Sequence, residues 1–503
     1  MATNRLNDAL LTTLDIDNYR SKNAPISIVH LGIGAFHRAH QAWYTDNVNL
    51  TSKSAPWYIA GVSLRSASVR EQLAPQDGLY HVIESDKNGK SATLIQAVKQ
   101  LLVAPENPEA VLTLMTKPDT KIVSLTVTEK GYCHDPATNK LDFSNPSIVH
   151  DLENLDKPKS AIGFIASSLQ KRFTSHGQGL TVLCCDNLPQ NGTTLKGLIC
   201  EFAEQLDPNL VAWIKLHVSF PNSMVDRIVP ATTPQDIEDF QQDGIQDLGL
   251  VKSERFSQWV IEDNFVAGRP AWEDVGVTLV EDVEPFENAK LRLLNGAHSA
   301  LAYIGFLSGY QYVHEVMADE YLTKYLKHVM HNEIMPTLSA PPGLDLTQYI
   351  NDLLERFRNP VLHHSTYQIA MDGSQKLPQR LLNTVIDRIA SQESIEGLSF
   401  AIASWLRYTM AFDQKGDTIE VQDPLADTLL IIRQQHWDHI DELIRQYLDV
   451  SSVFPASLSQ SDIFSQRVTY WLSYILANGV QTALQSLLLE VQDYSIKPLG
   501  ALS

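Results

Sequence analysis

Cysteine is scarce in this 503-residue chain, which has only four, at positions 133, 184, 185 and 200. They form neither a C-x-x-C pair nor the spacing of a zinc site. Cys184 and Cys185 fall in an apolar run, where free cysteine acts as a small hydrophobe. We therefore expect neither a structural metal nor disulfides. The chain also lacks any run of about 18 apolar residues, so we expect no membrane-spanning helix.

Positive charge is also in short supply, because 39 Lys and Arg face 59 Asp and Glu, for a formal net charge of -20. This balance argues against nucleic acid and anionic membranes as partners. An acidic substrate would need a locally positive pocket. Residues 1–9 lack the apolar core of a signal peptide, so we expect a cytoplasmic protein. A monomer is the working hypothesis for its oligomeric state.

The length exceeds what one hydrophobic core accommodates and predicts two or more domains. In the first half, strand-like runs alternate with helical stretches, and near-continuous apolar strands of this kind predict a parallel sheet covered on both faces. The clearest strands are expected at Ile26–Leu31, Tyr58–Leu64, Lys121–Thr128 and Leu180–Cys185.

Helical periodicity dominates after about residue 286. The expected helices are Asn288–Leu307, Asp319–Met335, Leu346–Phe357, Pro378–Ala390, Phe400–Ala411 and Leu425–Tyr447. The predicted fold class is therefore α/β. A doubly wound, Rossmann-type dinucleotide-binding domain is expected over residues 1–285. A mostly α-helical domain that carries the substrate and catalytic groups is expected over residues 286–503.

The first predicted strand ends in Gly32-x-Gly34 and continues into residues that can open a helix. The backbone N–H groups of such a turn receive the pyrophosphate of a dinucleotide. The candidate cofactor contacts here are Gly32, Ile33, Gly34, Ala35 and Phe36. The usual third glycine is missing, because His37 stands in its place.

The second predicted strand bears on the choice of cofactor. An NAD site commonly shows Asp or Glu at the end of this strand, where it binds the ribose 2′-hydroxyl. Residues 60–65 contain neither, and Arg65 could instead receive the 2′-phosphate of NADP. NAD and NADP therefore both remain open from the residues alone.

Lys290, Asn295 and His298 place an amine, a carboxamide and an imidazole within about two and a half helical turns. At ~100° per residue, Asn295 lies ~140° and His298 ~80° from Lys290, so all three can line one wall of a cleft. This set suits chemistry on an alcohol or ketone, with one proton acceptor and two groups that hold the oxygen. The alternative is a solvated lysine, a capping asparagine and a buried histidine.

Lys290 is the candidate general acid/base. A free lysine titrates near ~10.4, so the role needs a lowered pKa. Partial burial and a position in the first turn of a helix would both lower it. Pro285 and the acidic run at 281–284 predict a helix that begins shortly before Lys290.

These segments together resemble the polyol-specific long-chain dehydrogenases/reductases, the mannitol dehydrogenase family. The resemblance covers nearly the whole chain, and the stretches that carry it are LGIGAFHRAH (31–40), TVTEKGY (126–132), CDNLPQNG (185–192), FPNSMVDRIVP (220–230) and KLRLLNGAH (290–298). Residues 260–270 and 368–380 look most like the fructuronate reductase (D-mannonate oxidoreductase) branch. The resemblance implies NADH-dependent reduction of D-fructuronate to D-mannonate, with a sugar acid or polyol as the small-molecule partner. Mannitol 2-dehydrogenase activity, which interconverts D-mannitol and D-fructose, is the alternative.

The resemblance also implies catalytic roles. The lysine matching Lys290 moves the proton, and the residues matching Asn295 and His298 donate to the substrate oxygen. Fixed donors of this kind are worth about 2.7–4 kcal/mol each. Glu129 is expected near the catalytic lysine, where it helps to pass protons or water. Its alternative is a surface carboxylate that pairs with a neighbour.

Asn187 and Asp226 match family positions that contact substrate hydroxyls, and Asn187 and Thr126 are also expected near the cofactor. Asp226 and Arg227 could instead form a local ion pair. Lys376 and Arg380 could clamp a carboxylate, Arg380 in the bidentate mode. Their alternative is solvated charge at a helix start.

Two histidine pairs, His363-His364 and His37/His40, invite a metal interpretation, but neither has the further ligand spacing of a zinc site. We therefore expect metal-independent catalysis. A dinucleotide-binding regulator without turnover is the competing class of function. It would fit a chain without Lys290, Asn295 or His298, and all three are present.

Overall fold

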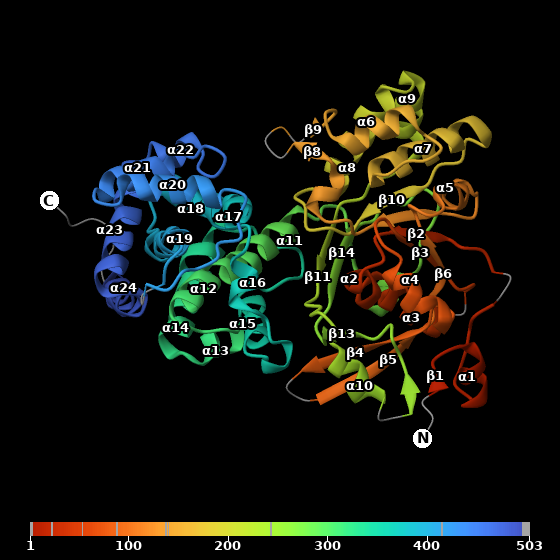
Figure 1. Cartoon of the computed structure of the whole chain (residues 1–503), viewed down its shortest axis with the longest axis horizontal. Coiled ribbons are helices and arrows are strands. Elements are labelled where there is room, and N and C mark those ends of the chain that lie inside the picture. The colour runs from red at the N-terminus through yellow and green to blue at the C-terminus, as the bar shows by residue number, and fades with distance from the viewer. Residues whose placement is uncertain are drawn as a thin grey trace. The chain divides into compact units, whose positions relative to one another are not determined.

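The computed structural model describes residues 4–21, 24–52, 54–86, 89–135, 138, 140–241, 244–413 and 416–494. The chain divides into two compact units, Met1–Glu284 (unit 1) and Pro285–Ser503 (unit 2) (Figure 1). Each unit has its own hydrophobic core.

A five-stranded parallel sheet forms the centre of unit 1, in the order β10-β7-β2-β3-β6. The chain adds β3 and β6 on one side of β2 and then β7 and β10 on the other, which is the doubly wound order. The predicted Rossmann-type fold is therefore confirmed. The four predicted strands are present and slightly shorter than expected. The strands of this sheet are β2 (Ile28–Leu31), β3 (Ile59–Ser63), β6 (Val98–Val103), β7 (Ile122–Leu125) and β10 (Thr181–Cys184).

Helices cover both faces of this sheet (Figure 1). Successive strand residues point to opposite faces. Val29 and Leu31 therefore pack in the core with α5, α7, α8 and α9, whereas Ile28 packs on the other side with α3. Burial on both faces explains the near-continuous apolar strands. The helices of unit 1 are α1 (Asp8–Thr13), α2 (Ala35–Ala39), α3 (Gln41–Thr51), α4 (Ser68–Leu73), α5 (Pro108–Thr116), α6 (Pro146–Glu153), α7 (Ala161–Ser175), α8 (Asn191–Glu204), α9 (Pro208–His217) and α10 (Pro234–Phe240).

Smaller sheets that the sequence analysis did not predict complete unit 1. They are ordered β13-β4-β5, β11-β14-β15, β1-β12 and β8-β9. Their strands are β1 (Asn4–Arg5), β4 (Tyr80–Asp86), β5 (Gly89–Ile95), β8 (His134–Asp135), β9 (Lys140–Leu141), β11 (Ser223–Asp226), β12 (Ile245–Gln246), β13 (Val251–Glu254), β14 (Gln258–Glu262) and β15 (Thr278–Val280).

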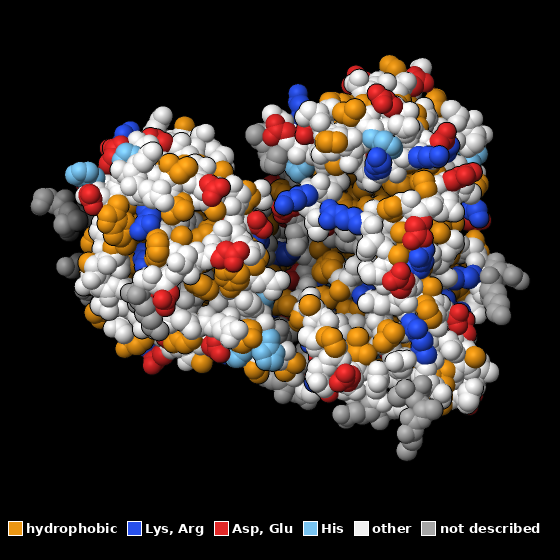
Figure 2. All heavy atoms as spheres, viewed as in Figure 1, with side chains coloured by type: hydrophobic (Ala, Val, Ile, Leu, Met, Phe, Trp, Pro, Cys, Tyr) orange, Lys and Arg blue, Asp and Glu red, His pale blue; other side chains and the backbone are white. Residues whose placement is uncertain are grey.

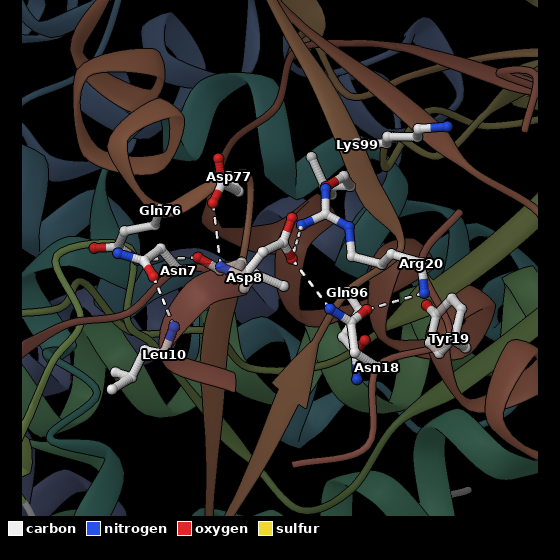
Figure 3. Close-up of polar contacts among 12 residues, drawn as sticks. Asn7, Asp8, Leu10, Asn18, Tyr19, Arg20, Gln76, Asp77, Gln96 and Lys99 are labelled. Atoms are coloured by element: carbon white, nitrogen blue, oxygen red, sulfur yellow. Dashed lines mark hydrogen bonds and ion pairs between the residues drawn. The ribbon is translucent and has the colours of Figure 1, made fainter. Parts of the chain in front are cut away.

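Polar contacts hold the N-terminal segment onto unit 1 (Figure 3). The Asp8 backbone N–H donates to the Asp77 carboxylate at 3.1 Å. The Asp8 carboxylate accepts from Arg20 at 3.3 Å and from Asn18 at 3.2 Å. The contact with Asp77 joins the first helix to the turn after residues 74–76, and the other two tie residues 18 and 20 to this helix.

Unit 2 is built from helices, as predicted. The predicted helix Leu425–Tyr447 is two helices in the structure, because residues 437–439 separate α20 from α21. The last two helices, α23 and α24, were not predicted. The helices are α11 (Glu284–Ala289), α12 (Gly296–Leu307), α13 (Val313–Ala318), α14 (Glu320–His328), α15 (Leu346–Phe357), α16 (Thr366–Ala370), α17 (Gly373–Leu377), α18 (Asn383–Ala390), α19 (Glu396–Thr409), α20 (Ala426–His436), α21 (Ile440–Leu448), α22 (Ala456–Ser459), α23 (Asp462–Asn478) and α24 (Val480–Tyr494).

Stretches of wider π-helix interrupt the helices of unit 2 at Lys290–Asn295, Val329–Ile334 and Pro378–Leu382. The sequence pattern predicted uninterrupted α-helix at all three. Short π segments are rare and are found frequently at functional sites. The first contains Lys290 and Asn295, and the third contains Arg380.

Acidic side chains lie scattered over the visible face of each unit rather than in one patch (Figure 2). Among the residues that the structure describes, no helix is both long enough and apolar enough to cross a membrane.

Candidate active site

Unit 1 contains a hollow of about 380 Å³ at the carboxyl ends of β2, β3 and β7. Ligands of doubly wound folds bind at this end of the sheet. Of the predicted cofactor contacts, those that line the hollow are Gly32, Ile33, Gly34, Arg65 and Thr126. The other three predicted contacts do not line the hollow. Ala35 and Phe36 form the start of α2, and Asn187 lies exposed in the loop after β10.

The turn after β2 requires glycine. Gly32 has a φ of 97°, and a Cβ atom built on it would lie 2.1 Å from the carbonyl oxygen of Thr126. Any side chain here would therefore have to push β2 and β7 apart. Gly34 is the residue that precedes the first turn of α2, so the turn directs a helix N-terminus and its backbone N–H groups toward the hollow.

The charged side chains that line this hollow are all cationic, namely Arg65, Lys130 and Lys159. No carboxylate is among its described lining residues. On a chain with a net charge of -20, this is a local reversal of sign that suits a dinucleotide pyrophosphate. The sequence analysis missed Lys130 and Lys159, although Lys130 lies within a motif that it quoted.

Glu129 follows a strained residue. Thr128 has a φ of 64°, a left-handed value that is unusual for a β-branched side chain. Glu129 then begins a 3₁₀ turn, Glu129–Tyr132, and its side chain is exposed. Strained backbone of this kind clusters at functional sites, where surrounding contacts hold it in place.

Asp186 supplies those contacts. Its carboxylate accepts hydrogen bonds from the Val127 N–H at 2.8 Å, the Thr128 N–H at 3.2 Å and the Tyr132 hydroxyl at 2.7 Å. The loop with Asn187 is thereby tied to the loop with Glu129. The sequence analysis missed this role, and the signal for it was an acidic residue directly after a buried strand.

Asp226 is buried at the end of β11. The neighbouring Arg227 forms its ion pair with Glu84, at 2.5 Å, and also donates to the Ala39 carbonyl at 2.5 Å. This contact joins β4 to the end of α2. Arg227, which could have paired with Asp226, is therefore paired with Glu84, more than 140 residues away in the sequence.

In unit 2, Lys290 is buried, with 6% of its surface exposed, and it begins the first π segment. The helix starts at Glu284, so Lys290 lies in its second turn. The expectation of a first-turn position was therefore wrong. We expected both burial and the helix dipole to act on Lys290. Because the effect of the dipole fades beyond the first turn, only burial remains of these two.

The π segment also corrects the expected angle between Lys290 and Asn295. The N–H of Gly296 donates to the carbonyl of Leu291, five residues earlier. With bonds of this type, residues five apart lie close to one turn apart. Lys290 and Asn295 therefore share a face, instead of standing ~140° apart as in an α-helix.

His298 follows on α12, with 7% of its surface exposed. Its ring centroid lies 4.5 Å from that of Phe357 and 5.1 Å from that of His364. Burial, together with the charges of His364, Arg380 and Arg356, lowers its pKa well below the usual value. His298 is therefore neutral near pH 7. Its Nε2 atom is buried with no hydrogen-bond partner among the described residues.

Arg380 lies beside this cluster. Its Nη1 atom donates to the Ser299 hydroxyl at 3.2 Å. Lys376 instead donates to the backbone carbonyls of Met371 at 2.5 Å and Ile369 at 3.5 Å. The two predicted carboxylate-binding cations thus have different roles in the structure, because Lys376 is tied to the C-terminal end of α16.

A further cation anchors the first π segment. Arg292 donates to the Thr337 hydroxyl at 2.9 Å and to the Asp387 carboxylate at 2.5 Å. It thereby joins this segment to α18 and to the turn after the second π segment. The sequence analysis did not single out Arg292, although it lies between Lys290 and Asn295.

Comparison with known proteins identifies the family. The mannitol dehydrogenase Rossmann domain matches residues 26–274, and the mannitol dehydrogenase C-terminal domain matches residues 282–476. This chain belongs to the mannitol dehydrogenase family. It is an oxidoreductase, and the predicted resemblance is confirmed.

Individual relatives match over most of their length. The D-mannonate oxidoreductase of Escherichia coli (strain K12) is 44% identical over 466 residues, covering 92% of this chain and 95% of the relative. A mannitol 2-dehydrogenase of Pyricularia oryzae is 38% identical, covering 94% and 95%. The solved ternary complex of Pseudomonas fluorescens mannitol 2-dehydrogenase with NAD and D-mannitol has a TM-score of 0.86 and 36% identity, covering 96% of this chain and 99% of that one.

One histidine of each pair that invited a metal interpretation packs against another imidazole ring. His37 is stacked on His30, and His364 lies against His298. Within the described part of the chain, no group of three or more His, Cys, Asp or Glu side chains is placed to hold a metal ion.

Gly296→Ala is expected to destabilise unit 2. The added Cβ would lie 2.7 Å from the backbone carbonyl of Arg380, so one π segment would have to move. Such overpacking costs about 1–3 kcal/mol. The control is Gly197→Ala, at an exposed position of α8 with open space around it, which should gain about 0.5–1 kcal/mol. Urea unfolding followed by tryptophan fluorescence measures both, and equal effects would contradict the close approach.

Acid should weaken unit 2 through its buried histidines. Burial lowers the pKa of His364 to about 4, whereas an unfolded histidine titrates near 6.5. Between these values the unfolded chain binds more protons, so stability falls as pH drops, by up to about 1.4 kcal/mol per pH unit and histidine. His364→Phe keeps the ring and should flatten this slope. Unfolding midpoints measured from pH 7 to 4 test it, and an unchanged slope would contradict it.

Proposed function

We propose that this enzyme reduces D-fructuronate to D-mannonate with NADH. The observation that carries the proposal is the cluster in unit 2, where Lys290 and Asn295 share a face and the positive charge of Arg380 acts on the neutral His298. A proton donor, two groups for the ketone oxygen and a cation for a carboxylate are what reduction of a keto acid needs. The 44% identity to a D-mannonate oxidoreductase supports it.

The chain's own residues handle the proton and the oxygen. When bound, NADH supplies the hydride for the ketone carbon. Asn295 and the neutral imidazole of His298 donate hydrogen bonds to the oxygen as negative charge develops on it. The ammonium of Lys290 then gives its proton to that oxygen, which completes the alcohol. We also propose that Glu129 helps to pass protons, and that Asn187 and Asp226 bind substrate hydroxyls.

The hollow of unit 1 fits the dinucleotide. Its turn has a conformation and a close approach to Thr126 that only glycine allows at position 32, and its cations suit the pyrophosphate. NAD is the proposed cofactor, in line with the NAD bound in the Pseudomonas fluorescens enzyme. NADP is the second candidate, because the lining places Arg65 and no carboxylate near the end of β3.

Interconversion of D-mannitol and D-fructose is the second candidate function. It is favoured by the match to the mannitol 2-dehydrogenase complex and by the contacts of Lys376, whose ammonium donates to backbone carbonyls. Rates with D-fructuronate and D-fructose, each with NADH and NADPH, decide between the activities. A higher kcat/KM for D-fructose than for D-fructuronate would overturn the fructuronate assignment.

Lys290→Ala is expected to lower turnover at least about 10²–10⁴-fold, the usual contribution of a general acid–base group. NADH should still bind, because the glycine turn is unchanged. Steady-state rates and nucleotide fluorescence titration measure the two effects. Lys327→Ala, at an exposed position on α14, is the control and should leave both unchanged. Near-normal turnover of Lys290→Ala would remove it from the mechanism.

Arg380→Met should distinguish the substrates. Loss of a charge-assisted contact worth about 1.5–3 kcal/mol lowers kcat/KM for D-fructuronate roughly 10- to 150-fold. D-fructose has no carboxylate, so its loss should be much smaller. Arg445→Met, at an exposed position on α21, serves as the control. Equal losses on both substrates would show that Arg380 does not select the carboxylate.

A further inference from the structure

A buried imidazole links β2 and β7 beside the glycine turn. His30 on β2 is paired in register with Ser124 on β7, and both side chains are fully buried. The Nδ1 atom of His30 lies 2.8 Å from the Ser124 hydroxyl, and its Nε2 atom lies 2.9 Å from the Thr126 hydroxyl. The Ser124 hydroxyl in turn lies 2.7 Å from the amide of Gln41 on α3.

This chain of hydrogen bonds ends on the glycine turn. The Thr126 hydroxyl donates to the carbonyl of Gly32 at 2.9 Å, and Nε2 of His30 lies 3.2 Å from the same oxygen. The Gly34 N–H also donates to it, at 2.6 Å. The Gly32 carbonyl is thus held by His30 on β2 and by Thr126, directly after β7.

His37 covers the other side of His30. Their ring centroids are 3.4 Å apart, with an angle of 15° between the planes. Burial lowers the pKa of His30 to about 3 and that of His37 well below its usual value. Both rings are therefore neutral near pH 7, and they can stack without charge repulsion. His37 stands where the third glycine of the usual fingerprint would let helix and strand pack closely.

We infer that His30, with His37 stacked on it, is a positioning residue for cofactor binding. The imidazole pair takes the place of the third glycine: it fills the space between α2 and the sheet and orients the Gly32 carbonyl through Thr126. The turn is then already in its binding conformation before the dinucleotide arrives. The inference rests on the proposed function only in assigning a dinucleotide to the hollow.

Two variants of His30 test its two ring nitrogens separately. A Gln amide reaches the position of Nε2, whereas an Asn amide reaches only that of Nδ1. His30→Gln should therefore keep the contact with Thr126, and His30→Asn should lose it. We expect the Kd and KM for NADH to rise about five- to thirtyfold in His30→Asn, as for one unmade buried hydrogen bond. His30→Gln should stay within about threefold, and kcat at saturating NADH should hardly change in either.

Binding is measured by NADH fluorescence titration of the full chain, which needs no sugar substrate. Ile199→Ala, in the core on α8, lowers stability without contact to the turn and should leave the Kd unchanged. Ser124→Ala, which acts on the turn through His30, should raise it. Ser124→Ala also stays informative if the His30 variants do not fold.

The outcomes are distinct. A wild-type chain that does not bind NADH overturns the proposed cofactor site. Wild-type binding with equal Kd values for His30→Gln, His30→Asn and wild type overturns only the role of His30. An equal rise in the Kd of Ile199→Ala would show that lower stability explains the effect. This result would also overturn the role of His30.

Discussion

The close approach of two parallel strands at Gly32 is the constraint on which unit 1 depends. The backbone of the turn passes so near Thr126 that no side chain fits between them. This contact lies between β2 and β7, where the order of the sheet reverses and where doubly wound folds bind their ligands. The strands next to it must be buried on both faces, which accounts for their apolar sequences. The polar residues at this point, His30 and Ser124, are tolerated because they bind each other.

Unit 2 meets a different requirement by a change in helix geometry. In the proposed mechanism Lys290 and Asn295 act on the same oxygen, although on an α-helix they would stand ~140° apart. The π segment brings them to one face, and its wider backbone gives up the regular α-helical bonds in return. Arg292 compensates with contacts to Thr337 and Asp387. The third π segment, Pro378–Leu382, passes close enough that only glycine fits at position 296.

The sequence was sufficient for the sheet, the fold class and the family, because apolar runs and the glycine turn are local signals. It was insufficient for the π segments, because the helical periodicity there does not distinguish an α-helix from a π-helix. The contact of Asp186 with the loop of Glu129 was also beyond reach, since the residues are more than 50 apart in sequence. The sequence showed that His37 replaces the third glycine of the fingerprint. Explaining this replacement required the position of the His30 ring on the preceding strand.

The net negative charge of the chain imposes the same requirement on both units. An excess of acidic residues repels a dinucleotide and would also repel the proposed sugar acid, so each unit needs a local region of positive charge. In unit 1 this region consists of Arg65, Lys130 and Lys159 around a hollow without carboxylates among its described lining residues. In unit 2, Arg380 lies beside a histidine that burial keeps neutral. A protonated His298 would add a second positive charge there, but it would lose the acceptor side of its ring. A neutral His298 agrees with the proposal that Lys290 is the group that moves the proton.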